Sequence, residues 1–240
     1  MPETGSLPES DETFHATTRY LAALTELTAR DLSAPSALPG WSRGHVVAHL
    51  SRNADAFTRV LRQVQAGEPA SMYESSATRD RDIDETVGSG DIEALVKDAT
   101  TSSERYAEAA SIFDGDVRAS TYTRTPADAE TFPVSTVMPR RRTEVEVHHA
   151  DLMLDYLPSQ WPVNFSRALV RRRRDELSAN GGSSFVLVST DVDGLWRVGD
   201  GAGPQVSGAV GDLAWWLVGR GDGRGLVSST GELPRLGRWR

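Results

Sequence analysis

Four of the five histidines in this chain occur in two close pairs, and a glutamate lies one helical turn before one of the pairs. His45 and His49 form the first pair, His148 and His149 form the second, and Glu144 precedes His148 by four residues. Side chains four residues apart lie on the same face of a helix, so Glu144 and His148 can reach one ion together. An imidazole from the first pair would complete a set of two histidines and one carboxylate. Such a set leaves coordination positions open, as catalytic zinc sites do.

Spacing alone does not decide which histidine of each pair is a ligand, or whether an ion binds at all. A glutamate four residues before a histidine is frequent by chance, and paired histidines also occur as surface groups or hydrogen-bonded core groups. His49 falls within an apolar stripe that continues to Phe57, whereas His45 lies one turn nearer the start of that segment. His149 is rotated by about 100° from the face that carries His148. The metal set that we expect is His49, Glu144 and His148.

Helical periodicity places both histidine pairs on helices. Apolar residues recur at helical spacing in four segments. The expected helices cover residues 11–32, 42–67, 92–113 and 135–156, with Ser42 as the N-cap of the second and Pro139 starting or kinking the fourth. Four amphipathic helices predict a bundle, in which metal sites are built from inward-facing side chains of different helices. Asp151, near the end of the fourth helix, is a candidate acceptor for the imidazole of His148, with capping or solvent exposure as alternatives.

Two long crossings join these helices. We expect residues 68–89 and 115–131 to be irregular, and a loop as long as the first often carries function. After Pro158 the pattern changes to a basic helix at 165–177, strand-like runs at 184–190, 194–198 and 206–210, and a helix at 212–218. The expected fold class is therefore α+β, with a four-helix bundle over residues 1–157 and a smaller α+β domain over residues 158–240.

Composition excludes several classes of function. The formal net charge is -8, with 34 acidic against 26 basic side chains, so no overall positive field would hold a nucleic acid. No apolar stretch is long enough to span a bilayer, and the first ten residues do not have the pattern of a signal peptide. We therefore expect a cytoplasmic protein that binds neither nucleic acid nor membrane. The chain has no cysteine, so any sulfur nucleophile must come from outside it.

Four segments resemble one enzyme family, the mycothiol-dependent maleylpyruvate isomerases. The likeness extends over nearly the whole chain in the expected order. The segments are GWSRGHVVAHLSRNADA (Gly40 to Ala56), MYESSATRDRDI (Met72 to Ile83), RRTEVEVHHADL (Arg141 to Leu152) and GRGDGRGLVSSTGELP (Gly219 to Pro234). The first and third are shared by the wider DinB-like superfamily, whereas the second and fourth are more specific to the isomerases.

The resemblance implies a fold, a metal and a cofactor. The fold is a DinB-like four-helix bundle followed by a small C-terminal α+β domain. Zinc is bound by His49, Glu144 and His148, and Arg220 is the arginine of a turn that family members need for activity. His49 and Arg220 are then the implied catalytic residues. The thiol is supplied by mycothiol, which binds zinc through sulfur and thereby has its pKa lowered.

The implied reaction converts maleylpyruvate to fumarylpyruvate, a step of gentisate-type aromatic catabolism. We expect the thiolate to add to the cis double bond, the resulting single bond to rotate, and the thiolate to leave. The substrate carries two carboxylates, for which arginines are the natural clamps. Arg220 is the first candidate, followed by Arg79 and Arg81 on the long crossing, which as surface residues would more often be solvated.

Three alternatives stay open at this point. The same ligands would serve a mycothiol S-transferase or another detoxifying enzyme of the superfamily. A non-enzymatic bundle with a structural ion or none is a second alternative, and a metal-dependent hydrolase is a third, for which only His45 suggests a general base. The expected partners are small molecules, namely mycothiol and a dicarboxylate substrate, and we expect a monomer.

Overall fold

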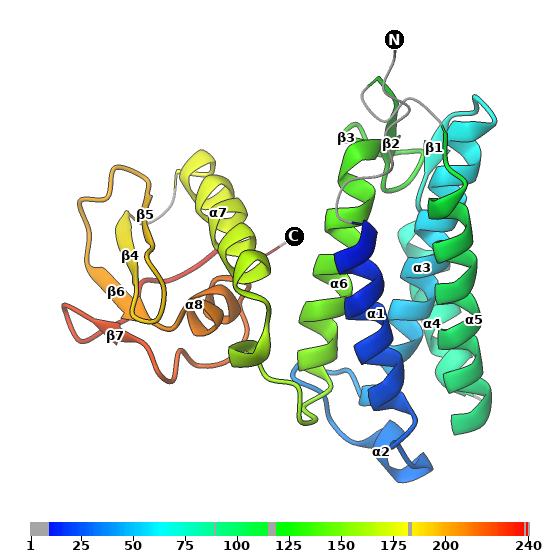
Figure 1. The fold of residues 1–240 in the computed structure, drawn as a ribbon, viewed down its shortest axis with the longest axis horizontal. Helices are drawn as coiled ribbons and strands as arrows, with labels where there is room; N and C mark the ends of the chain where they lie inside the picture. The colour runs from blue at the N-terminus through cyan, green and yellow to red at the C-terminus, as the bar shows by residue number, and fades with distance from the viewer. Residues whose placement is uncertain (1–9, 89, 115–118, 182–183, 238, 240) are drawn as a thin grey trace. The chain divides into compact units, whose positions relative to one another are not determined.

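The computed structural model describes residues 10–88, 90–114, 119–181, 184–237 and 239, and Figure 1 shows their course. The chain divides into two compact units, Met1–Leu152 and Met153–Arg240. Each unit is described by itself below. Among the described residues, no helix combines the length and the apolar character needed to cross a membrane.

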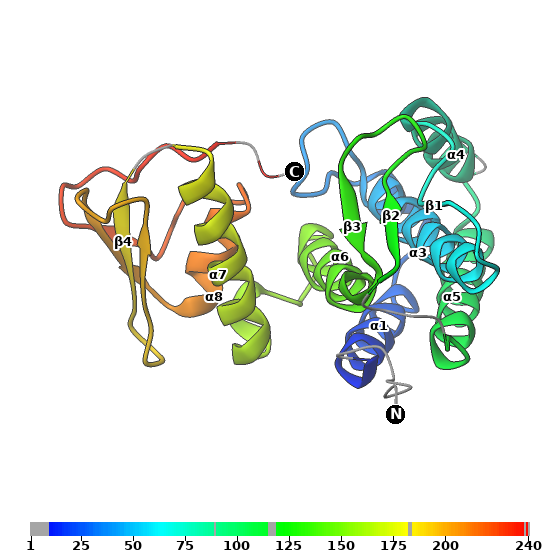
Figure 2. The same ribbon diagram turned by 90° about the horizontal axis from the view of Figure 1, so that it is seen from above.

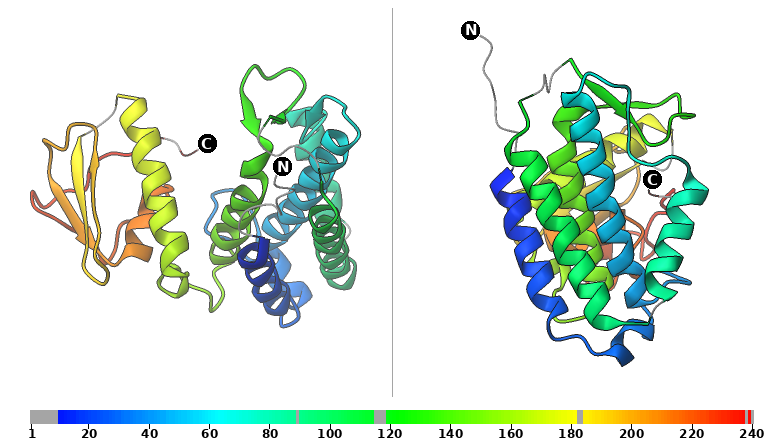
Figure 3. Two further views of the ribbon diagram at one scale, coloured as in Figure 1. Left: turned by 45° about the horizontal axis from the view of Figure 1, so that its top comes forward. Right: turned by 90° about the vertical axis from the view of Figure 1, so that its right-hand side faces the viewer.

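Four long helices form the N-terminal unit. They are α1 (Ser10–Leu24), α3 (Arg43–Gln65), α5 (Ile92–Ser111) and α6 (Val137–Asp151). Helix α3 packs against α5 and α6, and α1 packs against α6 and α5. The right-hand view of Figure 3 shows these helices running side by side. The bundle predicted from the apolar periodicity is therefore confirmed.

Helix α3 packs against both α5 and α6, and most of its buried side chains are apolar. Ser42 precedes it as the N-cap, and its hydroxyl accepts a hydrogen bond from the backbone N–H of His45. This satisfies one of the N–H groups that a helix leaves unpaired at its start. The fully buried apolar side chains of the helix are Val46, Val47, Ala48, Leu50, Ala54, Phe57, Val60 and Leu61.

Two helix ends differ from the prediction. The segment expected as one helix over residues 11–32 forms α1 and a separate short helix, α2 (Ala29–Ser33). Thr28 starts α2, because its backbone N–H and its hydroxyl both donate to the carboxylate of Asp31. The helix expected to reach residue 156 ends at Asp151, shortly before Met153, whose φ of 54° is left-handed.

The long crossings contain regular structure that was not predicted. Residues 68–89 form strand β1 (Ala70–Ser71) and helix α4 (Ser76–Gly88), which packs against α3. The crossing expected as irregular over residues 115–131 contains β2 (Thr121–Thr123) and leads into β3 (Thr131–Pro133), while residues 115–118 lie outside the described residues. The three strands form a small sheet in the order β1-β2-β3.

The C-terminal unit packs two helices with a four-stranded sheet (Figure 2). Its elements are η2 (Pro158–Gln160), α7 (Val163–Ala179), β4 (Phe185–Ser189), β5 (Leu195–Val198), β6 (Gln205–Gly208), α8 (Val210–Leu217) and β7 (Val227–Ser228). The strand order is β5-β4-β6-β7, with β4 and β6 parallel and the other pairs antiparallel. The predicted α+β class is confirmed, and β7 is the strand that the sequence did not predict.

Close contact between α8 and η2 depends on a glycine. A Cβ at Gly211 would lie 2.3 Å from the backbone oxygen of Pro158, closer than two such atoms can approach. We expect Gly211→Ala to destabilise the protein by about 1–3 kcal/mol, because overpacking outweighs the gain in helix propensity of up to about 1 kcal/mol. Thermal unfolding followed by circular dichroism measures the change.

Gly88→Ala is the matched control for this substitution. A Cβ at Gly88, the last residue of α4, would meet no atom within 4 Å. The control should unfold at or above the temperature of the original protein. An equal loss of stability in both variants would contradict the steric explanation for Gly211.

Candidate metal centre

Three side chains from two helices of the bundle converge. His49 comes from α3, and Glu144 and His148 come from successive turns of α6. The Oε2 atom of Glu144 lies 2.9 Å from Nε2 of His49 and 3.4 Å from Nε2 of His148. One potential ligand atom from each residue lies within 4.8 Å of the others. The residues that the sequence singled out as a metal set are thus brought together.

The donor set fits a divalent ion. Atoms bound to one zinc ion at about 2.0–2.2 Å lie at most about 4.4 Å apart, and the two separations from the Glu144 oxygen fall within that limit. Two imidazoles and a carboxylate suit zinc and other first-row metals. Three protein ligands leave at least one position for an exogenous ligand, and this is the arrangement of catalytic zinc sites.

His148 is oriented by a buried carboxylate. Its Nδ1 donates a hydrogen bond to Oδ2 of Asp151 over 2.8 Å, and Asp151 is fully buried. With one hydrogen held on Nδ1 by Asp151, Nε2 is the nitrogen that faces Glu144, and it is the atom that a metal would bind after losing its own proton. Histidine ligands of metals usually donate their second N–H to a carboxylate or carbonyl in this way. The contact with Asp151 therefore favours the tautomer that a metal at Nε2 requires, once Nε2 has lost its proton.

We expect Asp151→Asn to weaken zinc binding about 10-fold to 100-fold, the usual cost of changing a partner of a ligating histidine. The amide has the size of the carboxylate but no charge, so it accepts a weaker hydrogen bond from Nδ1 of His148. Competition with a chromogenic chelator measures the affinity. Asp155→Asn, the same change at an exposed position, is the control and should bind zinc normally. Equal affinities in the two variants would remove Asp151 from the site.

His49 has a different partner from His148. The Nδ1 atom of His49 lies 3.0 Å from Nη2 of Arg79, a residue of α4. The Nη1 atom of the same arginine pairs with Asp80 over 2.6 Å. The Arg79 guanidinium lies 5.9 Å from the centroid of the Trp41 ring and 5.8 Å from that of Tyr73. Trp41 also packs edge-on against His49, with ring centroids 5.5 Å apart. Sequence analysis named Arg79 as a candidate for binding the substrate, but it did not predict that Arg79 and Trp41 contact His49.

Charge and burial set the protonation of the three residues. Burial lowers the pKa of His49 to about 4, although its hydrogen bond with Glu144 acts in the opposite direction. Burial raises the pKa of Glu144, but hydrogen bonds from His148 and His49 outweigh it and hold that pKa well below the usual value. Burial also opposes the charge on His148, yet its hydrogen bonds to Asp151 and Glu144 raise its pKa. At neutral pH the group therefore offers a neutral imidazole at His49 and a carboxylate, the forms that bind metals.

A buried arginine ties the two helices together beside the group. Arg141 is fully buried one turn before Glu144, and its Nη1 donates to the backbone oxygen of Leu50 and to Oδ1 of Asn53 on α3. Its guanidinium also lies 5.8 Å from the centroid of the Tyr106 ring. These contacts fix α6 against α3 next to His49. Arg141 lies between two other arginines in the sequence, Arg140 and Arg142, so no local pattern marks it for this role.

The other histidines and arginines that the sequence placed near the candidate metal centre do not contact the three predicted ligands in the same way as Arg79. His45 contacts Ser42 through Nδ1 and lies 3.8 Å from Asp84, whereas His149 is buried with its ring edge-on to Tyr20. Arg81 has 60% of its side chain exposed and lies 3.8 Å from both Asp82 and Glu85 on its own helix. Arg79 alone, of the two arginines predicted on the crossing, contacts one of the three predicted ligands. The role of Arg81 stays a prediction.

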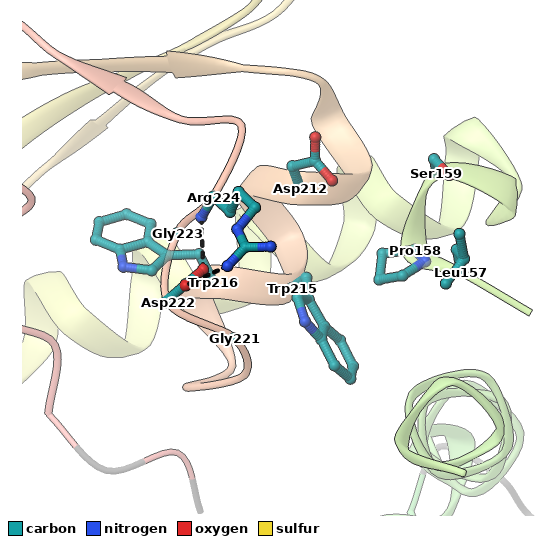
Figure 4. A pocket seen from close by; sticks show the side chains of 10 residues that line it. All are labelled: Leu157, Pro158, Ser159, Asp212, Trp215, Trp216, Gly221, Asp222, Gly223 and Arg224. Carbon is teal, nitrogen blue, oxygen red and sulfur yellow. Dashed lines mark hydrogen bonds and ion pairs between the residues drawn. The ribbon is translucent and has the colours of Figure 1, made fainter. Parts of the chain in front are cut away.

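Arg220 lies in the C-terminal unit, in the glycine-rich turn after α8. Its Nη1 donates to the backbone oxygen of Val218, and its guanidinium lies 5.3 Å from the centroid of the Trp239 ring. The turn continues into the wall of a pocket of about 250 Å³, which Figure 4 shows between α8 and η2. Trp215 and Arg224 flank that pocket, but Arg220 does not line it. Its predicted catalytic role stays a prediction.

The fold is that of a DinB-like four-helix bundle with a small α+β unit after it. A sequence model of the family described as the mycothiol maleylpyruvate isomerase N-terminal domain matches residues 14–153. The match covers more than half of the chain, and the chain therefore belongs to this family.

Solved structures agree with the family. A crystal structure of the mycothiol-dependent maleylpyruvate isomerase is similar over 100% of both chains, with 26% sequence identity and a TM-score of 0.88. A structure of a histidine-to-alanine mutant of that isomerase is similar over the same extent, with 26% identity and a TM-score of 0.86. No curated protein sequence matches this chain significantly.

Proposed function

We propose that this protein is a mycothiol-dependent isomerase that converts maleylpyruvate to fumarylpyruvate in the cytoplasm. The observation that carries the proposal is the convergence of His49, Glu144 and His148 inside a bundle of this family. The full-length similarity to an isomerase of that name supports it.

The three residues would hold a divalent ion, for which zinc is our proposal. Bound there, the ion would lower the pKa of a coordinated thiol, so that thiolate is present at neutral pH. The chain has no cysteine, so a thiol cofactor would supply the nucleophile that adds to the cis double bond and leaves after rotation. Helices α3 and α6 would keep water from the two histidine ligands, which are both buried, while Glu144 is 30% exposed and leaves the site open to a ligand.

Arginines would bind the carboxylates of the substrate. Two observations support Arg79 for this role: its guanidinium contacts His49, and only 15% of its side chain is exposed. A guanidinium forms paired, charge-assisted hydrogen bonds with a carboxylate. Arg220 is the second candidate, from its position in the motif GRGDGRG.

An absorbance assay with maleylpyruvate tests the proposal. Zinc-loaded protein should produce fumarylpyruvate only when mycothiol is added. Accumulation of a stable thioether in place of the isomer would favour an S-transferase, the alternative that uses the same ligands. Absence of any thiol-dependent turnover, in protein shown to carry zinc, would refute both enzyme assignments.

A further inference from the structure

A second cavity of the N-terminal unit adjoins the candidate metal centre. It has a volume of about 230 Å³ and lies between α3 and α4. Arg79 lines it and also donates to His49, so one side chain separates the cavity from the proposed ligands. We call this cavity the α3–α4 pocket.

Charged side chains line the α3–α4 pocket in equal numbers of each sign. They are Arg52, Arg59, Arg79, Asp55, Glu74 and Asp82. Three positive and three negative groups cancel, so the pocket offers many donors and acceptors without a net charge. Cross-pairs hold the groups in place, such as Arg59 with Glu74 over 3.2 Å. An occupant that carried two negative charges would leave two negative charges uncompensated in the pocket, so a dicarboxylate is not the ligand that this lining selects.

Neutral groups with several hydroxyls fit such a lining, because each hydroxyl both donates and accepts. The buried Tyr73 and Ala56 add apolar surface to the walls, which suits the C–H faces of a ring. The volume is below the roughly 300–1,000 Å³ of pockets that enclose a whole small molecule. The pocket would therefore hold part of a ligand whose remainder extends past Arg79.

We propose that the α3–α4 pocket binds the neutral sugar and cyclitol portion of the thiol cofactor, while the sulfur reaches the three proposed ligands. This inference rests on the proposed function, since it needs a sugar-bearing thiol. The sugar portion of the cofactor would then be bound by residues of α3 and α4. The substrate would bind on the other side of Arg79, next to the metal.

Calorimetric titration of zinc-loaded protein with mycothiol tests the assignment, with N-acetylcysteine as a thiol that lacks the sugar. Ala56→Leu fills the pocket from α3, and we expect it to raise the Kd for mycothiol at least 10-fold with an unchanged Kd for N-acetylcysteine. Arg62→Gln, at an exposed position one turn beyond Arg59, is the control and should leave both values unchanged.

Arg59→Gln and Glu74→Gln keep the test valid if Ala56→Leu fails to fold. They change the pocket charge in opposite directions at partly exposed positions. A neutral occupant should lose affinity in both, each by a few-fold. An anionic occupant should bind tighter to Glu74→Gln and weaker to Arg59→Gln, and that result would overturn the proposal.

Two results separate this inference from the proposed function. If the original protein binds mycothiol and isomerises maleylpyruvate, but the pocket variants bind mycothiol as it does, the pocket assignment alone is wrong. If the original protein does not bind mycothiol, both are wrong. Parallel weakening of mycothiol and N-acetylcysteine would also overturn the assignment, since it would indicate damage at the metal.

Discussion

Glu144→Gln should leave the purified protein without stoichiometric divalent metal and without thiol-dependent isomerisation. Glu144 supplies the carboxylate of the group, and its oxygen lies 2.9 Å and 3.4 Å from the two imidazole nitrogens. Glutamine preserves the shape and can still pair with one histidine, but it removes the negative charge. Changing a residue that only hydrogen-bonds a metal ligand lowers metal affinity by up to about 100-fold. We expect zinc affinity to fall by more than this in Glu144→Gln, because Glu144 is itself a proposed ligand.

Metal analysis after dialysis against limiting zinc measures this loss, and the maleylpyruvate assay measures its consequence. Glu104→Gln on α5 makes the same chemical change at an exposed position and should retain both metal and activity. A Glu144→Gln protein that keeps the metal content of the original would show that the three residues are not the binding site. Retained metal with lost turnover would instead point to a role for the carboxylate in the reaction.

The ligand helices could be predicted from sequence because their signals are local. A spacing of four residues puts Glu144 and His148 on one face whatever the fold, and the apolar stripe of α3 points its members inward. His49 belongs to that stripe, and it is buried as the pattern indicates. The hydrogen bond between His148 and Asp151 follows from the same local geometry, since the two residues are three apart.

Helix α4 could not be found from apolar periodicity. Only Ile83 of its 13 residues is buried, so there is no apolar stripe to detect. Its start does have a local signal: the hydroxyl of Ser75 accepts from the backbone N–H of Thr78, as an N-cap does. Weighing capping residues along with apolar spacing would have turned the predicted loop into a helix.

Contacts between distant segments were beyond sequence reasoning. Arg79 is 30 residues from His49, and Arg141 is 88 residues from Asn53, so neither contact has a spacing that could predict it. Both depend on how α4 and α6 pack against α3. These tertiary contacts bring Arg79, and not the exposed Arg81, against His49.

Arg79→Gln should shift two measured quantities in opposite directions, because Arg79 opposes the metal-bound form of His49. A guanidinium only donates, so its contact with Nδ1 of His49 requires a lone pair on that atom and places the ring hydrogen on Nε2. A metal at Nε2 requires the reverse, with the hydrogen on Nδ1. Metal binding therefore costs the Arg79 contact.

The glutamine carbonyl can accept a hydrogen bond from Nδ1–H, and this is the partner that ligating histidines usually have. We expect Arg79→Gln to bind zinc more tightly, by up to about 10-fold to 100-fold. Its kcat/KM for maleylpyruvate should fall by about 10-fold to 100-fold, since one charge-assisted hydrogen bond contributes about 1.5–3 kcal/mol. Arg62→Gln should change neither value.

The two measurements together distinguish the roles of the arginines. Tighter zinc binding would show that Arg79 competes with the metal for His49. A lower kcat/KM would show that Arg79 binds the substrate carboxylate. Weaker zinc binding would contradict the tautomer argument, and unchanged turnover would contradict the clamp. Arg81→Gln completes the comparison: its exposed side chain should not affect zinc binding, so a fall in kcat/KM for that variant would assign the substrate carboxylate to Arg81.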